Sequence, residues 1–351
     1  MASSKDIHST LLAEIANLLK ILDHEGGNLD HAVTHKVENS LNAIKDISSL
    51  WQAHTTKLAL AFKPPISGEA ALKCLEEAGK LPRLLVAAYN AIDEDDKTGL
   101  MKPEVKDHID MLFLAENSFL EELKEAVVRE RLLLQNLRPA SADSNARTLV
   151  SVGEVWESCK KLQALIDNGP VAVLQGKITA YSGIIRDAVE EFKELMEEER
   201  EDSDDENNDD DVDKPPSAVS DSEEVDDFEE FNFSAPSKPL SKELRQVGIK
   251  WKDMFIRLPT VTEVLCKTLC KRLENTESTK IIKINTCIKS ISEATDDLVF
   301  GFSDNSITDV KEGFVVVTKE LETIADLTTR PDDNFSTQLR AYIEKFKANN
   351  S

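Results

Sequence analysis

Apolar residues recur at steps of three and four along almost the whole chain, and this spacing restricts its fold more than any other feature. Such steps place side chains on one face of an α-helix, whereas the strict alternation typical of a half-buried strand is nearly absent. The clearest run comprises Val171, Leu174, Ile178, Tyr181, Ile185, Ala188, Phe192 and Leu195. Seams of this kind suit packing between helices. The sequence therefore predicts an all-α protein of antiparallel helical bundles with short turns.

Several of the expected helices end at glycine or proline, which break helices. They cover about residues 7–26, 29–62, 67–88 with a kink at Pro82, 109–137, 149–166, 171–197, 241–258, 261–269, 281–302, 307–327 and 335–346.

One acidic segment interrupts the helical pattern. Glu197 to Glu230 holds nineteen of the chain's 66 Asp and Glu residues against two basic residues, a local charge of −17 out of −24. So dense a like-charge run with little apolar surface cannot offset its ordering entropy. We therefore expect a helical block at 1–197, a disordered acidic linker at 198–237, and a second helical block at 238–351 that packs with the first.

Composition narrows the class of protein. Five dispersed cysteines without a CxxC spacing suit a reducing compartment, and the start MASSKDIHST lacks the pattern of a secretory signal. The longest apolar stretches are too short to span a membrane. The acidic balance disfavours direct binding to nucleic acid or anionic lipid. The sequence thus predicts a soluble protein of the cytoplasm or nucleus.

One pair of histidines and one pair of cysteines are spaced like metal ligands, but they fit ordinary surface and core positions better. His31 and His35 lack the glutamate of a zinc-protease motif, which favours solvated surface histidines. Cys266 and Cys270 follow Leu265 and Leu269 on an apolar stripe, which favours small core residues. No phosphate loop or nucleophile motif is present, so we expect neither an enzyme nor a bound cofactor or metal.

Serines in the acidic linker are candidates for phosphorylation. Ser203 precedes Asp204-Asp205-Glu206, and Ser220 and Ser222 lie within another acidic run. A hydroxyl with acid at the third following position suits acidophilic kinases, and each phosphate would add nearly two negative charges. An acidic linker that merely contains serine explains the pattern equally well.

Aromatic residues in the same linker are candidates for partner binding. Phe228, Phe231 and Phe233 punctuate the run DDFEEFNF. Surrounding charge can hold such rings exposed, so that they dock in a basic-rimmed groove of another protein. The alternative is that they pack on this protein's own helices.

Trp156 is expected in the core of the first block. It follows Val152 by four residues and precedes Cys159 and Leu162, so a single buried face could hold all four. A large aromatic residue in that position would contribute about 3–5 kcal/mol to stability.

Two stretches resemble a known family. VGEVWESCKKLQAL, the break DNGP and VLQGKITAYSGIIRDAVEEFKELMEE are similar to the fingerprint of the cyclin-D-binding protein family, also called GCIP or Maid. ISEATDDLVFGF resembles that family's second helical block more weakly. The matching positions are Trp156, Cys159, Asp296, Asp297 and Leu298. The resemblance implies a non-enzymatic, vinculin- or catenin-like helical bundle that binds D-type cyclins and helix-loop-helix factors, in cytoplasm and nucleus. It further implies a protein that restrains cell-cycle progression.

The resemblance also implies a leucine zipper, which the expected helix at 109–137 does not support. Glu116 and Glu130 fall where a zipper needs apolar residues. Intramolecular packing is the favoured interpretation. A function from another class stays open: an acidic chaperone or adaptor whose linker engages basic clients such as histones.

Overall fold

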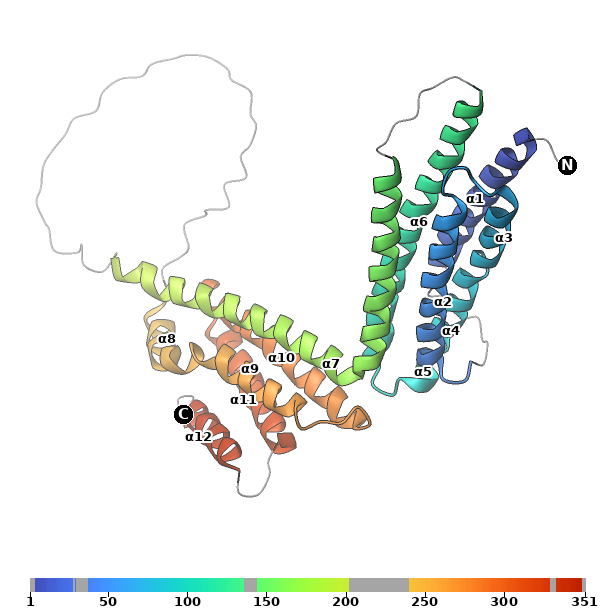
Figure 1. Cartoon of the computed structure of the whole chain (residues 1–351). Helices are drawn as coiled ribbons and strands as arrows, with labels where there is room; N and C mark the ends of the chain where they lie inside the picture. The colour runs from blue at the N-terminus through green and yellow to red at the C-terminus, as the bar shows by residue number, and fades with distance from the viewer. Residues whose placement is uncertain are drawn as a thin grey trace, which may run out of the picture. The chain divides into compact units, whose positions relative to one another are not determined.

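The computed structural model describes residues 4–27, 29, 37–135, 144–201, 240–328 and 333–348, and every regular element in these ranges is a helix (Figure 1). The all-α fold class is confirmed. The chain divides into two compact units: unit 1 is Met1–Leu174 with Leu273–Ile282, and unit 2 is Gln175–Arg272 with Lys283–Ser351. The contacts thus divide the chain within the helix expected at 171–197, whereas the sequence pattern divides it at residue 197, where the acidic run begins.

Unit 1 contains α1 to α6 and the first part of α7 (Figure 1). The bounds are α1 Ser4–Gly27, α2 Ser40–Ala61, α3 Gly68–Ala78, α4 Leu81–Asn90, α5 Ile92–Asp95, α6 Met101–Leu134 and α7 Ser144–Glu201. Helix α1 packs against α3, α4 and α6, and α2 packs against α3 and α4. The apolar stripes meet in one core, in which Ile15, Leu58, Leu75, Phe119 and Leu123 are fully buried.

Two expected helices of unit 1 have different boundaries in the structure. The helix predicted to begin at Leu29 begins at Ser40, where the side chain of Asn39 accepts a hydrogen bond from the Asn42 N–H at 3.3 Å. The kinked helix predicted at 67–88 is two helices, α3 and α4, with Pro82 in the first turn of α4. Proline is tolerated there because the N–H that it lacks would have no partner within the helix.

The predicted break at Asn168-Gly169-Pro170 is confirmed within α7. Gly169 has φ 71° and ψ −173°, a conformation that essentially only glycine adopts. The side chain of Asn275 lies against it, since Asn275 Oδ1 accepts the Val171 N–H at 3.2 Å. A Cβ at residue 169 would stand 2.6 Å from Asn275 Nδ2. The chain therefore requires glycine here for both conformation and space.

We expect Gly169→Ala to lower the free energy of unfolding by roughly 1–3 kcal/mol, because alanine would be strained in this conformation. Gly176→Ala is the matched control, since a Cβ at this helical position meets nothing within 4 Å. It should leave stability unchanged or raise it by about 0.5–1 kcal/mol. Urea denaturation followed by circular dichroism measures both, and equal effects would contradict the prediction.

Unit 2 is built from the second part of α7 and five further helices (Figure 1). These are α8 Lys242–Phe255, α9 Leu258–Cys270, α10 Ser278–Ser303, α11 Ile307–Thr328 and α12 Asn334–Ala348. Ser241 caps α8, because its Oγ accepts the Leu244 N–H at 3.3 Å. Buried aromatic rings connect the helices: Phe314 stacks on Trp251 with centroids 4.1 Å apart and on Phe346 with centroids 4.4 Å apart.

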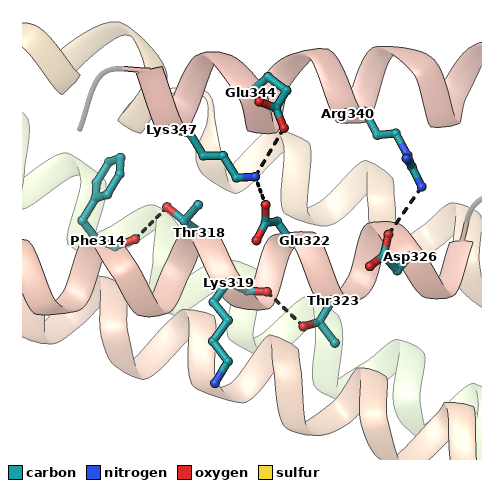
Figure 2. A network of polar contacts seen from close by, with 9 residues as sticks. All are labelled: Phe314, Thr318, Lys319, Glu322, Thr323, Asp326, Arg340, Glu344 and Lys347. Carbon is teal, nitrogen blue, oxygen red and sulfur yellow. Dashed lines mark hydrogen bonds and ion pairs between the residues drawn. The ribbon is translucent and has the colours of Figure 1, made fainter. Parts of the chain in front are cut away.

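Ion pairs join α11 and α12 beside this aromatic stack (Figure 2). Lys347 of α12 pairs with Glu322 of α11 and with Glu344 of its own helix, and Arg340 Nη2 lies 3.4 Å from Asp326 Oδ1. These groups are substantially exposed, so each pair contributes at most about 1 kcal/mol and is screened by salt. The stacked rings therefore hold α12 in place more than the charges do.

Candidate protein-interaction site

The described residues offer no evident catalytic or metal centre. Within these ranges, no three or more His, Cys, Asp or Glu side chains are grouped so that they could hold a metal ion. None of the described helices is both long and apolar enough to cross a membrane. Exposed apolar side chains that gather on ordered helices are candidates for a protein-interaction site.

Several residues predicted from the sequence lie outside the described residues. These are the linker candidates Phe228, Phe231, Phe233, Ser203, Ser220 and Ser222, and the histidines His31 and His35. Their predicted roles stay predictions. Residues 198–201 of the expected linker are described and continue α7 to Glu201.

The cysteines take the structural role predicted for them. Cys266 and Cys270 are buried in unit 2, and Cys159 is buried in unit 1. Burial, together with the nearby Glu116 carboxyl, raises the pKa of the Cys159 thiol to about 12. Because the thiolate is the reactive form, Cys159 is inert at neutral pH. In unit 2, Leu298 is fully buried while Asp296 and Asp297 are exposed.

The predicted burial of Trp156 is wrong. Its side chain is 38% exposed, whereas Val155, the residue before it, is fully buried. The buried face of α7 steps through Val152, Val155, Cys159 and Leu162, and one residue along a helix turns the side chain by about 100°. The step of four from Val152 therefore assigned Trp156 to the buried face, whereas the step of three to Val155 is the one that the structure buries. Trp156 lies at the surface.

Polar contacts between α2 and α7 fix the backbone that carries Trp156. Gln52 Nε2 donates to the carbonyl oxygen of Trp156 at 3.1 Å, and further along Gln163 Nε2 donates to Ser49 Oγ at 3.2 Å. Lys45 pairs with Asp167 at 2.5 Å. Residue numbers rise along α2 as they fall along α7, so the helices are antiparallel. We call this surface, from Lys45–Asp167 to Trp156, the α2–α7 seam.

Leu60 extends the apolar character of this surface. It is 69% exposed and lies about two turns after Gln52 on α2, pointing away from the buried face of that helix. Beside Trp156, a Cβ added at Gly153 would meet nothing within 4 Å. The seam thus presents apolar groups on a rigid, uncrowded surface. The sequence signal for Leu60 was its place in LALAF, two residues from both Leu58 and Phe62, which are four apart and buried on one face.

A buried carboxyl lies in the core of unit 1. Glu116 of α6 is 2% exposed, and its Oε2 accepts the indole N–H of Trp51 of α2 at 3.0 Å. Burial raises the pKa of Glu116 to about 7, although the hydrogen bond from Trp51 acts in the opposite direction. Glu130, the other carboxylate that interrupts the apolar pattern of α6, accepts the Ile66 N–H at 3.0 Å. Both residues therefore serve intramolecular packing.

Comparison with known proteins places the seam inside a recognised family region. Residues 43–198 match the family described as "Grap2 and cyclin-D-interacting, N-terminal". Residues 43–198 are therefore similar to the GCIP family. The resemblance drawn from the VW-x-x-C helix is confirmed, and Trp156, Gln52 and Leu60 all lie within the matched GCIP-like residues.

The chain is also similar to a protein from fission yeast. An uncharacterized protein of Schizosaccharomyces pombe is 24% identical to this chain over 203 residues. The match covers 55% of this chain and 58% of the yeast protein.

Proposed function

We propose that this chain is a non-enzymatic regulator that binds a D-type cyclin through Trp156 and the α2–α7 seam. The observation that carries the proposal is an exposed tryptophan on an ordered helix, within residues whose family is described as cyclin-D-interacting. The consequence of binding would be restraint of cell-cycle progression, in the cytoplasm and nucleus. Helix-loop-helix factors are the other partner class that the family resemblance supports.

The chemistry of the seam suits a protein partner. Tryptophan is enriched among the residues that dominate binding energy, because its large ring gains much from desolvation at little entropic cost. Two charge pairs lie along the seam, Lys45 with Asp167 and Glu157 with Lys161 at 2.8 Å. A partner that covers these pairs need not bury an isolated charge from them, which would be costly.

We expect Trp156→Ala to weaken binding of a D-type cyclin by about tenfold or more, as truncation of an interface anchor does. Its free energy of unfolding should fall by less than the roughly 3–5 kcal/mol expected for a fully buried aromatic side chain, because Trp156 is 38% exposed. Isothermal titration calorimetry and urea denaturation of the full chain measure the two effects separately. Leu60→Ala should weaken binding in the same direction.

Leu84→Ala provides the matched control, since Leu84 is a half-exposed residue on α4, away from α2 and α7 in the sequence. It should leave cyclin affinity unchanged. Wild-type affinity in Trp156→Ala would exclude the seam. Loss of affinity only in a triple Phe228→Ala, Phe231→Ala, Phe233→Ala variant would move the site to the acidic linker.

The acidic run supports a second candidate function, binding of basic clients such as histones. Its charge of −17 over Glu197 to Glu230 would attract them over long range. Such binding should collapse between low and moderate ionic strength, because salt screens exposed charges. Binding through an apolar anchor should largely survive the same change of salt.

A further inference from the structure

Helix α10 of unit 2 carries an exposed aromatic ring that the core does not explain. Phe300 is 68% exposed, whereas Phe302, two residues later, is fully buried. Phe302 contacts the rings of Phe192 and Trp251, with centroids 5.1 and 6.4 Å away. The two phenylalanines thus lie on opposite sides of one helix, and only Phe302 belongs to the core.

The exposure of Phe300 is not the result of a frayed helix end. Its carbonyl oxygen accepts the Asp304 N–H at 2.9 Å, and the Gly301 carbonyl accepts the Ser306 N–H at 2.8 Å. Gly301 also lies so close to α11 that a Cβ there would stand 3.0 Å from Val310 Cγ2. Phe300 is therefore held on a closed, tightly packed turn.

The surface around Phe300 is negatively charged. Asp296 and Asp297 are exposed and stand four and three residues before Phe300 on α10, which places them beside it. Asp304 is also exposed and stands four residues after Phe300, in the turn that directly follows α10. No Lys, Arg or His occurs between Ser290 and Val310. Glu293 extends the same side, where it pairs with Lys289 at 3.5 Å. We call Glu293, Asp296, Asp297, Phe300 and Asp304 the α10 face.

We propose that the α10 face docks the apolar face of a partner helix that is flanked by lysine or arginine. The ring of Phe300 would pack on that apolar face, and the neighbouring carboxylates would meet the flanking basic side chains. Charge complementarity selects this occupant, because the same carboxylates repel nucleic acid and anionic lipid. This face lies outside the residues that match the cyclin-D-interacting family, so it is independent of the seam.

A pair of synthetic amphipathic helices tests the proposal. Both carry the same leucine face, flanked by lysines in one and by glutamates in the other. The lysine peptide should bind the full chain and shift the amide resonances of α10, whereas the glutamate peptide should not. Phe300→Ala should weaken the lysine peptide by about tenfold or more.

Three further variants test the electrostatic part and the specificity of the site. Asp296→Asn with Asp297→Asn should weaken binding and reduce its dependence on salt. Val315→Ala removes another exposed apolar side chain of unit 2 and should leave affinity unchanged. Trp156→Ala should also leave it unchanged, which separates this face from the cyclin proposal. Equal binding of both peptides, binding of neither, or wild-type affinity in Phe300→Ala would overturn the proposal.

Discussion

Replacing Phe314 by alanine should lower the free energy of unfolding of unit 2 by about 3–5 kcal/mol, the usual range for deleting a large buried aromatic side chain. Phe314 is 1% exposed and lies between two rings, Trp251 of α8 and Phe346 of α12. The ring plane of Phe314 makes an angle of 25° with that of Trp251 and 4° with that of Phe346. Alanine would remove both stacking contacts and leave a cavity where three helices meet.

Phe300→Ala is the matched control, because it makes the same chemical change at a surface position of unit 2. It should alter the free energy of unfolding by less than about 1 kcal/mol. Guanidinium denaturation followed by circular dichroism compares the two variants. If both lost the same stability, Phe314 would not be the central packing residue that the stack indicates.

The spacing of apolar residues predicted most of the helices because burial of one helical face imposes that spacing directly. Every described helix except the short α5 overlaps an expected segment. The break at Gly169 and the start of α9 at Leu258, with Pro259 in its first turn, follow from the local chemistry of glycine and proline. The same logic placed Cys266 and Cys270 correctly in the core.

The candidate site was harder to predict, because residues three and four positions after a buried residue can each lie on the buried face of a helix. Trp156 was assigned to the buried face by its distance from Val152, while Val155 holds that position in the structure. Only the packing partners of α7 decide between the two, and no local pattern reveals them. The exposure of Phe300 was not predicted for the same reason, since the run VFGF does not show which of its two phenylalanines is buried.

For Glu116, the sequence indicates the buried position but not the hydrogen-bond partner. It follows Leu112 and precedes Leu120 by steps of four, so its place on the buried stripe of α6 could be read from the sequence. Its partner could not, because Trp51 lies 65 residues earlier in the chain. A long-range hydrogen bond of this kind depends on the register of α2 against α6, which the apolar pattern alone leaves open.

The same buried carboxyl should make the stability of unit 1 depend on pH. Burial raises the pKa of Glu116 from 4.5 to about 7, so between these values the folded state holds a proton that the unfolded chain releases. The contribution of protonated Glu116 to the free energy of unfolding is fully present below pH 4.5 and is lost as the pH rises to about 7. Since one pKa unit corresponds to about 1.4 kcal/mol, the loss is on the order of 3 kcal/mol.

Glu116→Gln should remove this loss, because the amide oxygen can still accept the indole N–H of Trp51 and carries no titrating proton. Near pH 4.5 the variant should match the wild type, and near pH 8 it should be more stable by on the order of 3 kcal/mol. Urea denaturation across this range measures the difference. Glu125→Gln, on the exposed side of the same helix, should keep the wild-type profile. Parallel profiles for wild type and Glu116→Gln would show that Glu116 is ionised equally in the folded and unfolded chain.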